Sequence, residues 1–127
     1  MIHVAIAVVR DADDRFLVGI RQAGTDLAGL HEFPGGKVES GESPSAAAVR
    51  ECTEETGIAI TVSERLLEIE HEYDHGKLRL EFFLATPVAA SATPRPPYEW
   101  VSRRALADCS FPAANAEIVA ALVGGKH

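Results

Sequence analysis

Three glutamates, Glu51, Glu54 and Glu55, are spaced so that a helix would place them on one face. Positions i, i+3 and i+4 fall within a sector of about 100° because each helical residue is rotated by about 100° from the previous one. The opposite side would carry small and apolar residues that can pack on a sheet, namely Ala48, Val49, Cys52 and Thr56. The pattern predicts an amphipathic helix with an acidic stripe.

This stripe is unfavourable for a helix on its own. Like charges four residues apart cost roughly 0.2–0.5 kcal/mol per pair, and anions near the C-terminal end oppose the helix dipole. A bound Mg²⁺ or Mn²⁺ would reverse the sign, because hard cations prefer carboxylate oxygens. The alternative is a solvated acidic face in which Arg50 pairs with Glu54. The preceding Gly35 and Gly36 favour the metal site, since they let backbone approach a ligand closely.

The segment from Gly36 to Ile58 is similar to the Nudix box. That box consists of a glycine, five residues, a glutamate, seven residues, and then Arg-Glu-apolar-x-Glu-Glu-x-Gly-apolar. The chain matches every fixed position, with a cysteine at the first apolar one: Gly36, Glu42, Arg50, Glu51, Cys52, Glu54, Glu55, Gly57 and Ile58. Three further segments resemble the MutT-like branch of this family, the 8-oxo-dGTP diphosphatases, in order and spacing: Glu32 to Lys37, Glu99-Trp100 and Phe111 to Asn115.

The resemblance implies an α/β fold, a Nudix-type α/β/α sandwich with a central mixed sheet, as a single domain over residues 1–127. It also implies a reaction in which Mg²⁺, or Mn²⁺ as a substitute, assists the attack of water on a nucleoside triphosphate. The products would be the monophosphate and pyrophosphate. Because a triphosphate carries about four negative charges, a cation is needed to screen it from the nucleophile.

The resemblance also assigns the metal and catalytic residues. The implied metal ligands are the carbonyl of Gly35 and the carboxylates of Glu51, Glu54, Glu55 and Glu99. The implied catalytic set is Glu51, Glu54, Glu55, Glu99 and Arg50. Glu51 and Glu99 both remain candidates for the general base, since sequence gives no distances. Arg50 is expected to orient Glu54, and Glu42 either closes the preceding loop or touches an outer metal.

Five residues are expected to contact substrate. Asn115, which follows Phe111-Pro112-Ala113-Ala114, resembles the base-reading asparagine of the MutT branch. Its amide offers one donor and one acceptor. The others are Arg21 and Lys37 for the nucleotide and its phosphates, and Phe33 and Tyr73 as aromatic walls for the base. Where the family places a basic residue near the base, this chain has Gly76, and Lys77 and Arg79 follow it.

Other functions stay open at this level. The same box serves enzymes that act on CTP-like pyrimidine nucleotides, dinucleoside polyphosphates or ADP-ribose. A non-catalytic nucleotide sensor is a further alternative. The complete set of acids argues against a sensor, because a pure binder has no need for a carboxylate that accepts a proton.

The elements that must position these residues follow from local patterns. The expected strands are residues 2–9 and 16–20, joined as a hairpin through Asp11 to Asp14, then 58–62, 66–73, 78–85 and 99–101. Ser43 and Pro44 predict the start of the acidic helix and Gly57 its end. Residues 87–97 form a proline-rich loop, Ser102 caps a short helix through Leu106, and Pro112 opens a last helix with Ile118, Ala121 and Leu122 on its apolar face.

Composition excludes several partner classes. The 127 residues suit one domain, and the net charge of −7 disfavours polymeric nucleic acid and anionic membranes. No apolar run approaches the roughly 18 residues of a membrane span. Two distant cysteines and no leader-like start lead us to expect a cytoplasmic protein. The expected partner is a small nucleoside triphosphate; protein partners and oligomeric state stay open.

Overall fold

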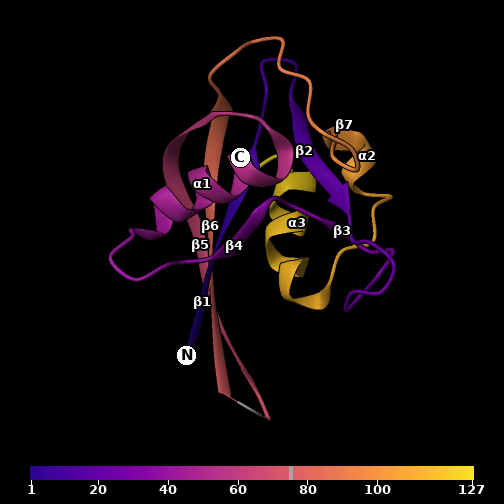
Figure 1. Ribbon diagram of the computed structural model, residues 1–127. Helices are drawn as coiled ribbons and strands as arrows, with labels where there is room; N and C mark the ends of the chain where they lie inside the picture. Colours follow the sequence, from indigo (N-terminus) through magenta and orange to yellow (C-terminus); the bar gives the residue numbers. More distant parts are fainter. Residues whose placement is uncertain (75) are drawn as a thin grey trace.

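The computed structural model describes residues 1–74 and 76–127, apart from the side chain of Tyr73. The elements are β1 (Ile2–Val9), β2 (Arg15–Ile20), β3 (His31–Glu32), β4 (Gly35–Lys37), α1 (Pro44–Thr56), β5 (Ile60–Tyr73), β6 (Gly76–Pro87), β7 (Glu99–Ser102), α2 (Arg103–Leu106), the 3₁₀ turn η1 (Ala113–Asn115) and α3 (Ala116–Val123). Figure 1 shows their arrangement. None of the helices in the described part is long and apolar enough to cross a membrane.

The strands form two sheets. The larger one has the order β4-β1-β6-β5 and is mixed, since β1 runs parallel to β6 while the other pairs are antiparallel. The smaller one, β3-β2-β7, is antiparallel. Helix α1 packs on one side of the sheets, and α2 and α3 pack on the other. This arrangement confirms the expected α/β class, with a mixed sheet and helices on both sides of it.

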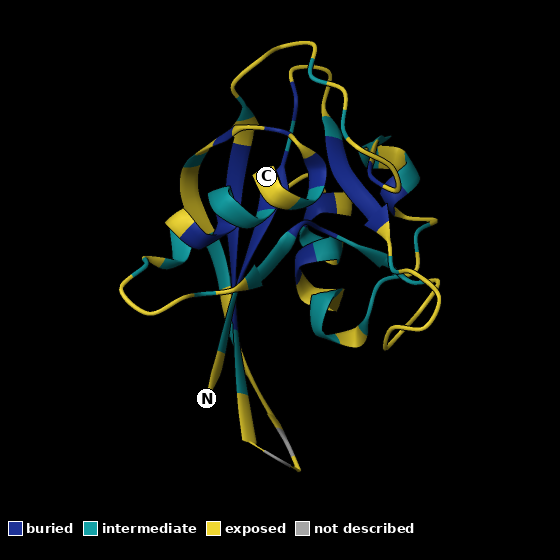
Figure 2. Ribbon diagram, in the orientation of Figure 1, coloured by how far each residue is buried: buried dark blue, intermediate teal, exposed yellow. Residues whose placement is uncertain are grey.

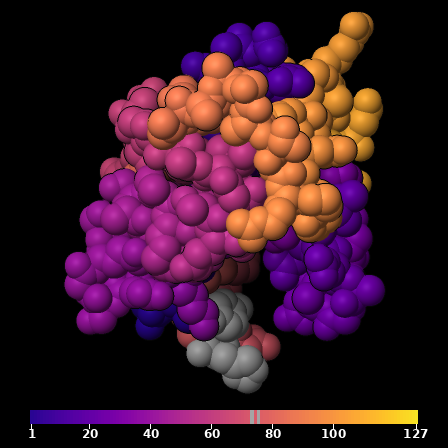
Figure 3. All heavy atoms as spheres, turned by 45° about the horizontal axis from the view of Figure 1, so that its top comes forward, coloured from indigo at the N-terminus to yellow at the C-terminus, as the bar shows by residue number. Residues whose placement is uncertain are grey.

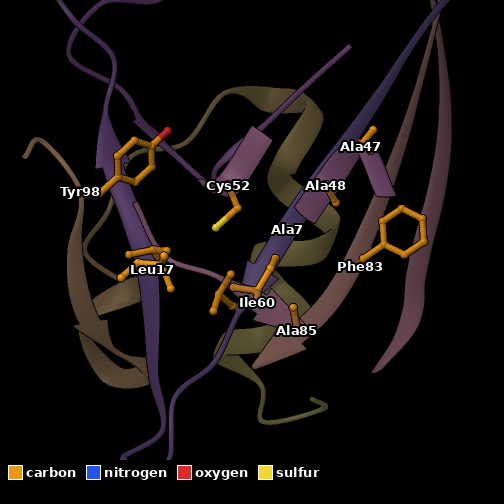
Figure 4. Packing of buried hydrophobic residues seen from close by; sticks show 12 residues of the cluster. Ala7, Leu17, Ala47, Ala48, Cys52, Ile60, Phe83, Ala85 and Tyr98 are labelled. Atoms are coloured by element: carbon orange, nitrogen blue, oxygen red, sulfur yellow. The ribbon is translucent and has the colours of Figure 1, made fainter. Parts of the chain in front are cut away.

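Alternation along β1 divides the core into two layers. Ala5, Ala7 and Val9 face α1 and pack with Cys52 of that helix, whereas Ile6 and Val8 face α2 and α3. Figure 4 shows the α1 layer, and the buried strand centres appear dark blue in Figure 2. Because successive strand residues point to opposite faces, one short apolar strand supplies both layers.

The predicted hairpin between the first two strands is wrong. Strand β1 pairs with β4 and β6, and β2 pairs with β3 and β7, so the two belong to different sheets. Only an isolated bridge joins Arg10 to Phe16 between them, within the part that the structure describes. The turn itself exists, because the Asp11 carboxylate accepts the amides of Asp13 and Arg15 at 3.0 and 2.8 Å. Both edges of β1 are already occupied, which sends β2 elsewhere.

The strands expected at 58–62 and 66–73 are one strand, β5. Its pairing with β6 shifts register between Val62 and Glu64 and again between Arg65 and Leu67. Each shift interrupts the alternation of inward and outward residues, and this is why the sequence looks like two strands. Asp74, His75 and Gly76 predict a tight turn between the strands at 66–73 and 78–85, but His75 lies outside the described residues.

The helix ends follow their caps. The Ser43 hydroxyl accepts the amide of Ala46 at 3.2 Å, Pro44 starts α1, and Gly57 ends it at φ 77°. The last helix differs from its prediction, since the 3₁₀ turn η1 precedes α3. Ile118 and Leu122 are buried as expected, while the predicted short helix after Ser102 is α2.

Candidate active site

Helix α1 presents the predicted acidic stripe at its C-terminal half. Its buried side consists of Ala47, Ala48, Cys52 and Thr56, packed on the sheet. Glu51, Glu54 and Glu55 therefore lie on the side away from this packing, with Glu54 exposed and the other two half-buried. The helix supplies three carboxylates beside β4, the strand of Gly35 and Gly36.

Glu55 is the most enclosed acid of the stripe. Its Oε1 accepts the main-chain amide of Gly35 at 2.9 Å. Burial raises the pKa of Glu55 to about 7, although the bond from Gly35 lowers it, and the charges of Glu51, Glu32 and Glu54 raise it further. A carboxyl that is hard to ionise among other acids gains most from a nearby cation.

The paired glycines make room for the protein's own groups. A Cβ on Gly36 would stand 2.4 Å from Cδ of Glu51, and a Cβ on Gly35 would stand 2.5 Å from the carbonyl oxygen of Ala5. Glycine is thus required at Gly36 for the Glu51 carboxylate to lie against β4. The sequence predicted a close approach at this point, and here the approaching groups are Glu51 and β1.

Arg50 organises the stripe. Its guanidinium donates to Glu42 at 2.8 Å, to Glu51 at 2.9 Å and to Glu54 at 3.3 Å. It also donates to the carbonyl of Lys37 at 3.0 Å. The expected pair with Glu54 is present but is the longest of the hydrogen bonds from Arg50 to a carboxylate. Glu42 closes the loop before the helix, because it also accepts the amide of Glu39 at 3.1 Å.

These acids have the chemistry of a cation site. Carboxylates and a main-chain carbonyl are the ligands that Mg²⁺ and Mn²⁺ prefer. Within residues 1–74 and 76–127, no three His, Cys, Asp or Glu side chains converge as they would around an ion. The reason is visible in the contacts: Arg50 draws Glu51 and Glu54 to itself, and Glu55 is bonded to Gly35. The donor set fits a divalent cation once the first two carboxylates turn from Arg50.

Glu99 is not brought together with the stripe. It is exposed on β7, opposite Val18 of β2. Burial raises the pKa of the Cys109 thiol, and the charges of Asp108 and Glu99 raise it further. The neighbour of Glu99, Tyr98, in contrast, lines a cleft beside Glu55.

That cleft has a volume of about 440 Å³. It lies beside the end of α1 and is lined by Ile20, Arg21, Gln22, Thr25, Glu32, Glu55, Arg95, Pro96, Pro97 and Tyr98. Arg21 was expected at the nucleotide, and the structure places it here. Its guanidinium donates to Glu32 at 3.3 Å and to the carbonyl of Asp26 at 2.7 Å.

Three residues of the cleft were missed by sequence reasoning: Glu32, Arg95 and Tyr98. Tyr98 is buried under Gly19, where a Cβ would stand 2.8 Å from its ring, and Figure 4 shows it in the core layer of Cys52. Burial raises the pKa of Tyr98, and the nearby Glu55 and Glu32 add to this effect. Glu32 belongs to a segment that carries the family resemblance, which is the one available signal. The proline-rich loop gave none for Arg95.

The other expected substrate contacts are spread around this region. Asn115 ends η1, and its side chain does not cap α3, so its amide is not used at the helix end. Phe33 is buried and stacked on Phe111 with ring centroids 4.8 Å apart, which favours packing. Lys37 is exposed at the end of β4. The side chain of Tyr73 lies outside the described residues.

The basic residues after Gly76 have partners on β5. Lys77 pairs with Glu72 at 3.6 Å, and Arg79 pairs with Glu70 at 3.0 Å. Both cations are therefore paired with acids within the β5–β6 hairpin.

Comparison with known proteins gives consistent matches. The family model described as "NUDIX domain" matches residues 5–121. The chain is 33% identical over 129 residues to an 8-oxo-dGTP diphosphatase of Haemophilus influenzae, covering 100% of this chain and 95% of that protein. It is 46% identical over 72 residues to a CTP pyrophosphohydrolase of Escherichia coli, covering 57% and 53%. A MutT structure from work on Aliivibrio salmonicida and Vibrio cholerae superposes with a TM-score of 0.71 at 32% identity, covering 98% of each chain.

Proposed function

Because this chain belongs to the NUDIX domain family and is a Nudix pyrophosphohydrolase, we propose that its substrate is 8-oxo-dGTP and that the reaction depends on Mg²⁺. The products are 8-oxo-dGMP and pyrophosphate, which removes an oxidised nucleotide from the cytoplasmic pool. The observation that carries the proposal is the acidic stripe of α1, held against β4 by Gly36 and the amide of Gly35.

The stripe supplies the cation site. Glu51, Glu54, Glu55 and the carbonyl of Gly35 would hold Mg²⁺ or Mn²⁺. When bound, the cation screens the phosphates and lowers the pKa of the attacking water. Glu51 and Glu54 reach this arrangement by turning away from Arg50. Arg50 stays in place meanwhile, because Glu42 and the carbonyl of Lys37 still hold it at 2.8 and 3.0 Å.

A carboxylate must also accept the proton of the attacking water. Glu51 lies within the stripe and against Gly36, whereas Glu99 is exposed on β7. A base has to be within hydrogen-bond reach of the water that it activates. The placement of Glu51 therefore supports Glu51 as the general base, with Glu99 as the alternative.

Asn115 supports the choice of base. Guanine presents two acceptors, O6 and N7, on one edge. In 8-oxoguanine N7 carries a proton, so the same edge presents an acceptor beside a donor and complements an amide. The side-chain amide of Asn115 makes no capping hydrogen bond to the N-terminal end of α3. The adjacent Ala114 is half-buried against the core layer of α2 and α3.

CTP is the second candidate, on one specific observation. The local identity of 46% to a CTP pyrophosphohydrolase exceeds the identity to the full-length 8-oxo-dGTP diphosphatase relative. That match spans 57% of this chain, so it describes part of the domain only.

A turnover screen with canonical and oxidised nucleotides in Mg²⁺ tests the proposal, with products identified by phosphorus NMR. We expect the highest kcat/KM with 8-oxo-dGTP, and monophosphate and pyrophosphate as products. A preference for CTP would select the second candidate, and orthophosphate as the first product would indicate a γ-phosphatase. No turnover of any nucleotide would favour a sensor.

A further inference from the structure

Arg95 connects the loop between β6 and β7 to the end of the acidic helix. Its amide donates to the carbonyl of Thr56 at 2.9 Å. Its guanidinium donates to the carbonyls of Glu54 at 3.1 Å and Thr53 at 3.5 Å. Figure 3 shows this loop, in orange, lying across the magenta surface of α1 and the residues after it. The side chain is thus fixed one residue away from Glu55.

The same side chain lines the cleft that contains Glu55 and Arg21. An arginine in this position attracts an anionic ligand strongly only if its positive charge is not already paired with an acidic side chain. Arg21 is paired with Glu32 at 3.3 Å, and Arg50 is paired with four glutamates between 2.8 and 3.7 Å. Across residues 1–74 and 76–127, Arg95 makes no comparable ion pair, and its partners are neutral carbonyls. Arg95 is therefore the cleft-lining arginine with an uncompensated charge.

Guanidinium chemistry identifies the ligand class. Five N–H groups are available on an arginine side chain, and two of its nitrogens are used here on helix carbonyls. The remaining donors form a planar fork that matches a phosphate group. The helix carbonyls hold the Arg95 guanidinium in one orientation without neutralising its charge. Little side-chain entropy therefore remains to be lost when an anion binds.

We propose that Arg95 contacts the distal phosphates of the substrate, the part that leaves as pyrophosphate. This inference rests on the proposed function. Glu55, one of the expected ligands of the cation, and Arg95 line the same cleft. Phosphates held by a cation at Glu55 would therefore lie in the cleft that Arg95 lines.

Calorimetric titration of the Mg²⁺-loaded protein with inorganic pyrophosphate, and separately with dGMP, tests the assignment without turnover. In Arg95→Gln the Kd for pyrophosphate should rise by about tenfold or more, the usual effect of losing a charged hydrogen bond. The Kd for dGMP should not change. Arg104→Gln, which removes an exposed arginine of α2, should change neither value.

A purely structural role at the helix end makes a different prediction. Arg95→Gln would then lower the melting temperature, and it would weaken the binding of pyrophosphate and of dGMP equally or leave both unchanged. Either binding result overturns the proposal. If the glutamine variant does not fold, Arg95→Lys carries the test, because it keeps the charge but loses the planar fork. Arg95→Lys must also weaken the binding of pyrophosphate and leave the binding of dGMP unchanged. Failure of the wild-type chain to hydrolyse nucleotides would refute the proposed function and leave these binding results to decide on Arg95.

Discussion

The glutamates of α1 and three glutamates of β5, Glu68, Glu70 and Glu72, form two acidic rows with different partners. On β5, Glu68 pairs with Arg65 at 3.2 Å, Glu70 with Arg79 at 3.0 Å and Glu72 with Lys77 at 3.6 Å. On α1, Glu51 and Glu54 share Arg50, while Glu55 has the Gly35 amide and three acids as its neighbours. The β5 row is balanced by the protein, and the α1 row is not.

This difference teaches that the number of acids in a row does not identify a cation site. The β5 row occupies alternate positions of an exposed hairpin, where each acid has its own cation and solvent screens the rest. In the α1 row Glu51 and Glu55 are half-buried, and all three acids are crowded at the unfavourable end of a helix. Its excess negative charge is the feature that a divalent cation would compensate.

The largest contrast between the rows should appear in catalysis. Glu55→Gln should lower kcat by roughly a thousandfold, since it removes a cation ligand. Glu70→Gln, the matched change on β5, should leave kcat unchanged. Wild-type activity should vanish in EDTA and return with Mg²⁺ or Mn²⁺. Chelator-resistant turnover, or an unfolded Glu55→Gln protein by circular dichroism, would show that the α1 row is structural.

Base selection should be independent of both rows. Asn115→Ala should reduce the preference for 8-oxo-dGTP over dGTP by about 5- to 150-fold, the range for an unpaired polar group costing 1–3 kcal/mol. The ratio of the two kcat/KM values measures this directly. The dependence on Mg²⁺ should not change. Equal losses on both substrates would remove Asn115 from base recognition.

Gly36 offers a way to disturb the α1 row from outside the helix. In Gly36→Ala the new Cβ would meet the Glu51 carboxylate within 2.4–2.7 Å and displace it. Because a flexible side chain gives way, the melting temperature should change little, while kcat should fall by about tenfold from loss of positioning. A variant with normal kcat would mean that Glu51 need not lie against β4.

The smallest effect concerns stability in EDTA. Glu55 has a pKa of about 7 in the folded protein and an ordinary value of 4.5, so the folded state binds its proton more tightly. This contribution to stability is fully present below pH 4.5 and is lost as pH rises toward 7. The free energies of unfolding of wild type and Glu55→Gln, measured in urea, should therefore diverge over this pH range by on the order of 1 kcal/mol after solvent screening. The variant should be the more stable protein above pH 7. Parallel pH profiles would contradict the burial of Glu55.

The sequence predicts features that are local. The ends of α1 follow from Ser43, Pro44 and Gly57, and the acidic face follows from helical spacing. The pairing of β1 with β6 could not be predicted in this way, because it joins residues far apart in the chain. The false hairpin has the same cause, since a turn after Val9 does not specify which strand β2 will meet.

The site shows the same division. The stripe and Arg50 were found because their partners lie within one short segment of chain. Arg95 and Tyr98 reach the cleft from a loop whose position depends on packing against Thr56 and Gly19. The spacing of residues along a proline-rich loop contains no information on such contacts.

Titration of the metal-free protein with Mn²⁺, monitored by electron paramagnetic resonance of the free ion, tests the central claim most directly. If the α1 row is a cation site, the wild-type chain binds Mn²⁺, Glu55→Gln binds it at least about tenfold more weakly, and Glu70→Gln binds it like the wild type. Equal weakening by both variants, or the same affinity in all three proteins, would contradict the distinction between the two rows.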